Sequence, residues 1–148
     1  MKTLGIDYGT KRIGIAITDE MGMLAFPKEI LINDGSTFKK LEQILKQENV
    51  QEIVIGESID FSGKLNALSA RIEVFILELK EKFKLPVYKQ VEFLTSVEAR
   101  KSTNIKIQFN SSGAHSKVKQ IKSGRIDAQA AALILQRYLD KKNKNIVQ

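Results

Sequence analysis

Four acidic side chains stand at positions where a sheet-containing fold could gather them into one site. Asp7 and Glu92 end apolar stretches that are typical of strands, and Glu57 follows a third such stretch. Asp127 lies in an alanine-rich helical stretch. In α/β folds, functional groups collect beyond the carboxyl ends of the strands. Convergent carboxylates without histidine are typical ligands of Mg²⁺ or Mn²⁺. Because a pair of such ions can hydrolyse a phosphodiester, these residues predict metal-dependent phosphodiester chemistry.

Asp127 carries the clearest signal of the four. On a helix it shares a face with apolar residues three, four, seven and eleven positions later, namely Ala130, Ala131, Ile134 and Tyr138. An acid on the face that meets a sheet is costly to bury without a partner or a cation. The alternative is a first-turn acid favoured by the helix dipole, worth only about 0.3–1 kcal/mol. A dipole partner would not need the apolar face, so the sequence favours a functional Asp127.

The other three acids also have purely structural interpretations. Asp7 precedes a glycine turn and is equally explained as a turn former that bonds the backbone of Gly9 or Thr10. Glu57 is equally explained as a loop acid, and Glu92 as an exposed acid at a strand end. Each alternative stays open from the residues alone.

Composition excludes several other chemistries. The chain has 148 residues, of which 43% are hydrophobic and 28% charged, which indicates one folded domain. It has no cysteine, so disulfides, thiolate zinc sites and thiol nucleophiles are excluded. His115 is the only histidine, which excludes a histidine metal cage, and it is better explained as a phosphate contact or a surface residue than as a catalyst.

The positive charge is concentrated in the last third of the chain. Residues 98–148 hold 11 basic and 3 acidic side chains, whereas residues 1–97 hold 13 basic and 14 acidic ones. Such asymmetry favours a polyanionic partner, nucleic acid, over a merely solvated lysine-rich surface. The residues expected to contact nucleic acid are Lys11, Arg12, Thr95, Lys117, Lys119, Lys122 and Arg125.

Hydrophobic periodicity predicts a sheet of five strands with crossing helices. The first three strands form an antiparallel meander, in which Pro27 indicates an edge strand or a bulge. The predicted strands are 2–7, 12–19, 24–32, 52–56 and 87–91, and the predicted helices are 36–48, 62–84, 95–102 and 125–140. Between 103 and 124 no periodicity is visible, so this stretch is expected to be structureless and functional.

This order predicts an α/β fold, a mixed five-stranded sheet with helices on both faces. One domain is expected over 1–140, followed by a frayed basic tail at 141–148. No apolar run reaches the length of a membrane span, and the first residues do not resemble a signal peptide. A cytoplasmic protein without a membrane partner is therefore expected.

Three motifs resemble the YqgF family of Holliday-junction-resolvase-like proteins, described as pre-16S rRNA nucleases. They are GIDYGTKRIGIA at 5–16, LTSVEA at 94–99 and IDAQAAALILQ at 126–136. The resemblance covers essentially the whole chain. It implies an RNase H-like fold and an acidic metal site, built from Asp7, a central glutamate and Asp127, that would hold Mg²⁺ or Mn²⁺.

The chain departs from the family pattern around the central glutamate. The family usually has Asp-Glu-Arg-Leu-Thr, where this chain has Val91, Glu92, Phe93 and then Leu-Thr. A family Gly-Leu-Pro has become Gly-Glu-Ser, which introduces Glu57. One acid is thus lost near one strand and gained near the next. We therefore consider the hypothesis that Glu57 takes over part of the missing ligand role.

Three functions are weighed. The first is a metal-dependent nuclease that processes the 5′ end of pre-16S rRNA or resolves Holliday-like junctions; the second is a non-catalytic nucleic-acid-binding or ribosome-assembly protein on the same fold. The third is a sugar-kinase-like ATP-binding protein, disfavoured because such kinases need two duplicated domains. The aromatic residues Tyr8, Tyr88 and Phe109 are as consistent with packing as with base stacking. RNA or DNA, and monomer or homodimer, stay open.

Overall fold

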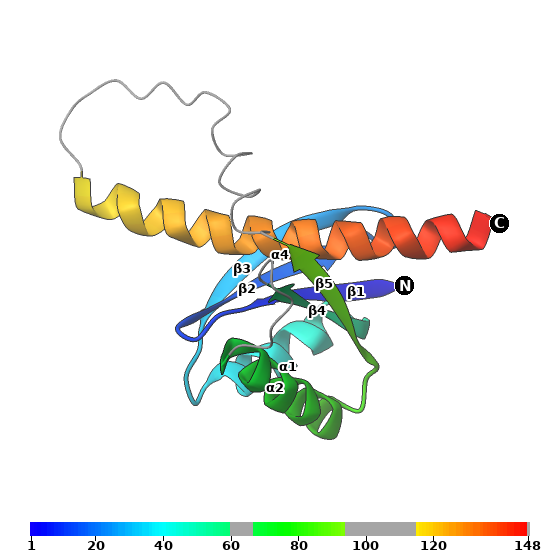
Figure 1. The fold of residues 1–148 in the computed structure, drawn as a ribbon, viewed down its shortest axis with the longest axis horizontal. Helices are drawn as coiled ribbons and strands as arrows, with labels where there is room; N and C mark the ends of the chain where they lie inside the picture. The colour runs from blue at the N-terminus through cyan, green and yellow to red at the C-terminus, as the bar shows by residue number, and fades with distance from the viewer. Residues whose placement is uncertain (60–66, 94–114, 148) are drawn as a thin grey trace.

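The computed structural model describes residues 1–59, 67–93 and 115–147, and at 58–59, 67, 92–93, 115–127 and 147 it describes the backbone only. Five strands and three helices are present in these ranges (Figure 1). They are β1 (Lys2–Tyr8), β2 (Arg12–Thr18), β3 (Ala25–Ile32), α1 (Thr37–Gln47), β4 (Val50–Ile59), α2 (Ala67–Phe83), β5 (Val87–Phe93) and α4 (His115–Val147).

The five strands form one mixed sheet in the order β3-β2-β1-β4-β5. β1, β2 and β3 pair antiparallel, whereas β4 and β5 continue the sheet parallel to β1. Pro27 lies on the edge strand β3, beside a register shift between Ile15 and Ala16 of β2. Both the predicted meander and the predicted edge position of Pro27 are therefore confirmed.

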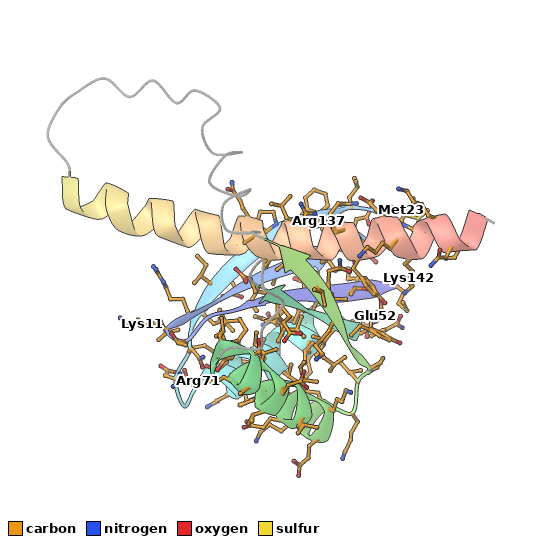
Figure 2. All side chains as sticks on the ribbon, in the orientation of Figure 1. Lys11, Met23, Glu52, Arg71, Arg137 and Lys142 are labelled. Atoms are coloured by element: carbon orange, nitrogen blue, oxygen red, sulfur yellow. The ribbon has the colours of Figure 1, made fainter. Side chains whose placement is uncertain are left out.

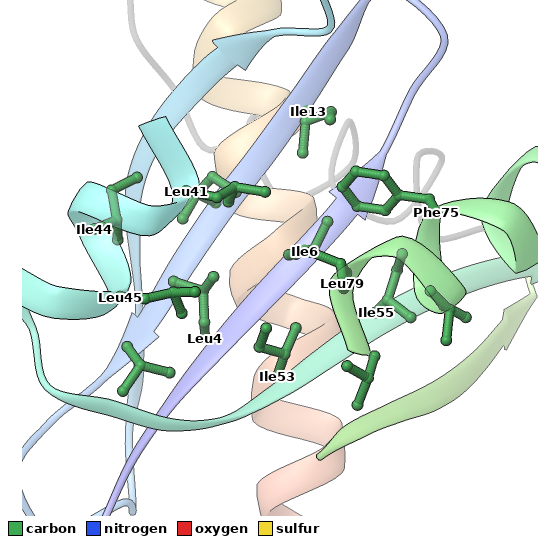
Figure 3. Packing of buried hydrophobic residues seen from close by; sticks show 14 of the residues in the cluster. Leu4, Ile6, Ile13, Leu41, Ile44, Leu45, Ile53, Ile55, Phe75 and Leu79 are labelled. Atoms are coloured by element: carbon green, nitrogen blue, oxygen red, sulfur yellow. The ribbon is translucent and has the colours of Figure 1, made fainter. Parts of the chain in front are cut away.

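The main hydrophobic core lies between the sheet and the helices α1 and α2. Leu41, Ile44 and Leu45 of α1 are buried in one cluster with strand residues such as Leu4 and Ile6 (Figure 3). Burying a large aliphatic side chain contributes roughly 1.5–3 kcal/mol. This layer therefore supplies most of the apolar burial that holds α1 and α2 on the sheet.

Among the described helices, α4 covers the opposite face of the sheet (Figure 1), where small residues pack beside Val54, Ile134, Leu135 and Leu139. Ala130 and Ala131 of α4 are buried. On the sheet side, a Cβ atom at Gly5 would lie only 2.8 Å from Leu135 Cβ and 3.1 Å from the Ala131 carbonyl oxygen. Glycine under alanine thus lets the helix backbone approach the central strand closely.

Both ends of α4 differ from the sequence prediction. α4 begins at His115 instead of Arg125 and ends at Val147 instead of Asp140, so neither a structureless segment over 115–124 nor a frayed tail over 141–147 is present. The first part of α4 extends beyond the sheet (Figure 1). A helix shows apolar periodicity only where one face is buried, so its early turns carried no such signal. The predicted helix at 95–102 lies outside the described residues.

The second difference concerns β4 and β5, which run to Ile59 and Phe93. Glu57 and Glu92 therefore lie within strands instead of beyond them. None of the helices in the described ranges is both long and apolar enough to cross a membrane.

Candidate active site

Asp7 lies near the carboxyl end of β1, on the face of the sheet that α4 covers. Side chains alternate along a strand, and Gly5, two residues earlier, packs under α4. Leu4 and Ile6, at the intervening positions, belong to the core on the other face. The register pairs Asp7 with Gly14 of β2 and with Gly56 of β4. Both residues paired directly with this half-buried carboxylate are therefore glycines.

Two contacts between α4 and β4 show the direction of the helix relative to β1 and β4. Near its end, Lys142 Nζ donates a hydrogen bond of 2.9 Å to Glu52 Oε1 at the start of β4. Eight residues earlier, Ile134 covers Gly56, where an added Cβ would lie 2.2 Å from Ile134 Cδ1. Eight helical residues span about 12 Å, and the four strand residues from Glu52 to Gly56 span about 13 Å. The helix therefore runs antiparallel to both strands.

This direction brings the position of Asp127 to the level of Asp7. Ala131 lies over Gly5. Two residues further along β1 is Asp7, about 6.6 Å away. One turn earlier on α4, about 5.4–6 Å back along the same helix face, is Asp127. The backbone position of Asp127 therefore lies level with the end of β1, and the face of its side chain stays a prediction.

Glu92 occupies a position on the same face of the sheet. Its register partner on β4 is Ser58, two residues after the Gly56 that pairs with Asp7. Tyr88, four residues earlier in β5, is on the same face of the strand, and its ring stacks on Tyr138 of α4 with 5.8 Å between the centroids. The backbone thus assigns Glu92 to the α4 face, although its side chain is outside the described atoms.

Glu57 faces the other way, which corrects the hypothesis that it replaces a metal ligand. It is 4% exposed and lies on the α2 side, where its Oε2 is 3.6 Å from Lys89 Nζ. Lys89 also pairs with Glu73 of α2, and mainly this hydrogen bond raises the pKa of Lys89, with Glu57 adding to it. The residue of β4 that pairs with Asp7 is Gly56. The sheet therefore separates Glu57 from Asp7.

The lost family acid lies on this other side as well. Val91 is paired with Glu57 in the register of β4 and β5, so both positions share the α2 face. Val91 is 44% exposed. Replacement of an acid by Val91 consequently removes no carboxylate from the face that carries Asp7.

The donor set on the α4 face fits a hard divalent cation. Asp7 would supply carboxylate oxygens, the positions of Glu92 and Asp127 would add further carboxylates, and the sequence has no cysteine to add a thiolate. Oxygen-only sets of this kind suit Mg²⁺ or Mn²⁺. Among the side chains that the structure describes, no three acids or histidines are close enough to form a complete metal-binding group.

The predicted nucleic-acid contacts are distributed around this end of the sheet. Lys11 and Arg12 are exposed in the turn and first strand position directly after Asp7. The predicted basic residues of α4 lie on turns that precede Asp127, at Lys117, Lys119, Lys122 and Arg125, where only the backbone is described. Thr95 lies outside the described residues.

Three residues that shape this site were not identified from the sequence as functional. Gly5 and Gly56 allow α4 to approach, and Asn33 braces the turn after Asp7 by donating from Nδ2 to the Gly9 carbonyl oxygen at 2.9 Å. The backbone N–H of Asn33 also donates to the carbonyl of Lys11 at 2.9 Å. The glycines flanking Asp7 in the opening motif were the only available signal.

Solved structures of resolvases share this fold. Thermus thermophilus RuvC in complex with a Holliday junction substrate superposes with a TM-score of 0.57 at 14% sequence identity. The superposition covers 96% of this chain and 96% of the RuvC chain. The fowlpox virus Holliday junction resolvase gives a TM-score of 0.52 at 17% identity, covering 95% of this chain and 99% of that one. The fold is therefore of the RNase H-like class found in these resolvases.

The family follows from sequence. A family model described as RuvX, Holliday junction resolvase, matches residues 1–141, and the chain belongs to this family. A relative from Lawsonia intracellularis, named "Putative pre-16S rRNA nuclease", is 36% identical over 151 residues, covering 100% of this chain and 99% of the relative. A relative of the same name from Lactobacillus acidophilus is 34% identical over 98% of this chain and 100% of its own length. These findings confirm the resemblance stated from the motifs.

Proposed function

We propose that the protein is a metal-dependent nuclease that hydrolyses phosphodiester bonds in structured nucleic acid. The substrate we favour is precursor 16S rRNA, trimmed at its 5′ end during ribosome biogenesis, and the alternative is a branched DNA junction. Processing of a ribosomal RNA precursor would place its work where ribosomes are assembled, in the cytoplasm.

The proposal is supported by the sheet register and the direction of α4, from which we infer that Asp7, Glu92 and Asp127 converge on one face. The family departures at Glu57 and Val91 both fall on the other face. In this proposal neither departure removes an acid of the site, which favours an active nuclease over a protein that only binds nucleic acid.

Each group has a distinct task in this proposal. Asp7, Glu92 and Asp127 would hold one or two divalent cations, which supply an activated water and stabilise the leaving oxygen. Gly5 and Gly56 keep α4 close enough for Asp127 to take part. Lys11 and Arg12, beside Asp7, would orient the scissile phosphate by charge.

The decisive experiment is a Mg²⁺ and Mn²⁺ titration of the purified protein on three substrates of matched length: a 16S rRNA precursor, a four-way DNA junction and an unbranched duplex. Metal-dependent cleavage of the precursor at a defined position supports rRNA processing. Symmetric cuts in the junction, together with a dimer in solution, favour resolution, because paired cuts need two-fold symmetry. Binding without cleavage under either metal would favour the non-catalytic alternative.

A further test addresses the basic turns of α4. Replacing Lys117 and Lys119 by alanine should weaken binding similarly for all sequences and reduce the slope of log affinity against log salt by about two, because each lost phosphate contact removes nearly one unit. Fluorescence anisotropy between low and moderate salt measures the slope. The exposed pair Lys39 and Lys40 on α1 provides the control, and an unchanged slope in the α4 variant would show that these lysines are only solvated.

A further inference from the structure

A second concave surface lies on the other side of the sheet from the acids. It is a cavity of about 360 Å³ between the end of β1, the start of α1 and the first turns of α2. Its inner wall consists of Tyr8, Phe38 and Phe75. This volume lies in the range of small-molecule sites, which are mostly apolar with a few oriented polar groups.

The aromatic wall is held in a fixed arrangement. The ring centroids of Tyr8 and Phe75 are 4.8 Å apart, and those of Phe38 and Phe75 are 5.4 Å apart. Phe75 is buried, whereas Val74 beside it is 55% exposed and contributes an apolar rim. A rigid apolar wall that stays open to solvent suits a flat ring, which gains by stacking and by contact with the rim.

The charged side chains that line the cavity favour an uncharged occupant over a phosphate. Two carboxylates, Asp34 and Glu78, line it together with one guanidinium, that of Arg71. Hydrogen bonds from the side chain and backbone of Ser36 lower the pKa of Asp34, so this carboxylate is ionised at neutral pH. A lining with a net negative charge disfavours an anion, whereas an uncharged heteroaromatic ring with N–H donors can pair with carboxylate oxygens.

The cavity and the proposed site of the acids lie at the same end of β1, on opposite faces of the sheet. Tyr8 follows Asp7 in β1, and because strand side chains alternate, the two residues serve opposite faces of the same strand end. Asn33, which also lines the cavity, donates to the carbonyl of Gly9 in the turn after Asp7. Figure 2 shows Arg71 and Lys11 at the same end of the molecule, with Glu52 and Lys142 at the other.

We propose that this cavity binds one unpaired nucleobase of the nucleic-acid substrate, next to the phosphate held at Asp7. The inference rests on the proposed nuclease function for the identity of its ligand. A strand that crosses the end of β1 with a phosphate on the α4 side presents its neighbouring base to the α1/α2 side. The cavity thereby selects substrates with an unpaired nucleotide beside the scissile bond.

The test compares two single-stranded oligonucleotides of equal length and charge, one with bases and one with abasic sugars throughout. Binding is measured in EDTA, so that it does not depend on cleavage. The wild-type protein should bind the base-bearing strand about tenfold more tightly, because stacking of one base is worth a factor of this order. Val74→Trp fills the cavity and should bring this ratio close to one.

Leu77→Trp is the matched control, because Leu77 is 65% exposed on the same helix and does not line the cavity. It should keep the wild-type ratio. If Val74→Trp lacks a wild-type thermal transition, Ala70→Trp, at another exposed position of the lining, takes its place. An unchanged ratio in the cavity-filling variant would overturn the proposal.

Two further arms separate the possible failures. Adenosine monophosphate should compete only weakly; competition at the affinity of the oligonucleotide would overturn the assignment to a substrate strand and indicate a free-nucleotide site. Absence of cleavage in the metal titration with an intact base-dependent ratio would defeat the nuclease proposal but leave the nucleobase site. Cleavage by a wild-type protein that binds both oligonucleotides equally would support the nuclease proposal and overturn the nucleobase site.

Discussion

The two faces of the sheet are packed in contrasting ways. On the α1/α2 face, large side chains such as Ile6, Ile55 and Leu79 are fully buried in a thick layer. On the α4 face, Gly5 and Ala131 bring backbone against backbone. The first face is filled by large side chains throughout, whereas the second combines large side chains such as Leu135 with glycine and alanine where helix and sheet come closest.

The contrast supports our placing of the proposed acidic site on the α4 face. A carboxylate on a helix can reach one on a strand end only if the two backbones are close, as they are under α4. Glu57, on the thick face, meets Lys89 instead. The proposed site therefore requires the close packing by small residues between α4 and the sheet.

The largest effect should come from replacing the acids of the α4 face by amides. Asp7→Asn and Asp127→Asn should lower metal-dependent cleavage by more than about 100-fold, because even outer partners of metal ligands cost up to that factor. Affinity for nucleic acid should change little, because phosphate contacts dominate it. Single-turnover cleavage and binding in EDTA measure the two quantities.

Glu57→Gln and Glu92→Gln complete this series. Glu92→Gln should resemble Asp7→Asn, whereas Glu57→Gln should keep near wild-type cleavage per folded molecule. If Glu57→Gln proved the more damaging of the two, the division of the acids between faces would be wrong.

Next in size is the effect of a methyl group between helix and sheet. Gly5→Ala should lower the free energy of unfolding by about 1–3 kcal/mol, because the new Cβ meets Leu135 Cβ and the backbone of Ala131. Cleavage should fall as well, since α4 must move outward. Gly35→Ala, which has open space around it, is the control and should leave both unchanged. Chemical denaturation and cleavage rates test this, and a tolerated Gly5→Ala would argue against the close approach.

A smaller change on the thick face sharpens the comparison. Ile55→Val removes one buried methyl group and should cost about 0.5–1.5 kcal/mol of unfolding free energy. Because Ile55 faces α1 and α2, cleavage per folded molecule should stay constant at temperatures well below the transition. Reduced cleavage without reduced stability would show that the two faces are not independent.

The smallest effect concerns Tyr138 of α4, whose ring stacks on Tyr88 of β5. Burial, and secondarily the nearby Glu52, raises the pKa of Tyr138 from 10.0 to about 12. Since the neutral phenol is favoured in the folded state, the stability due to this shift is present below pH 10 and is lost as the pH rises toward 12. Tyr138→Phe removes the titrating group. The stability difference between wild type and variant should therefore shrink between pH 9 and pH 12 in denaturant titrations, and a constant difference would contradict the shift.

Local periodicity was sufficient to predict much of this molecule. The alternation of Leu4 and Ile6 placed Asp7 on the opposite face of its strand, and the helical spacing predicted that Ala131 and Ile134 of α4 are buried, as they are. The strand order followed from the meander and the crossing helices. Each of these inferences depends only on the geometry of one element or on short connections, which the order of residues determines directly.

The choice between Glu57 and Glu92 depended on tertiary structure. The run Ile53-Val54-Ile55 is buried on both faces of β4, so it shows no alternation from which a facing direction could be deduced. Only the pairing of Gly56 with Asp7, and of Glu92 with Ser58, decides which acid shares the face of Asp7. A shift of one residue in that register would have exchanged their roles.

The early turns of α4 and the aromatic cavity were likewise beyond the sequence. A helix that leaves the sheet needs no apolar stripe, so its residues carry no helical signal. The cavity joins Tyr8, Phe38 and Phe75 from three elements. Their proximity results from how α1 and α2 pack on the sheet, and no spacing along the chain encodes it.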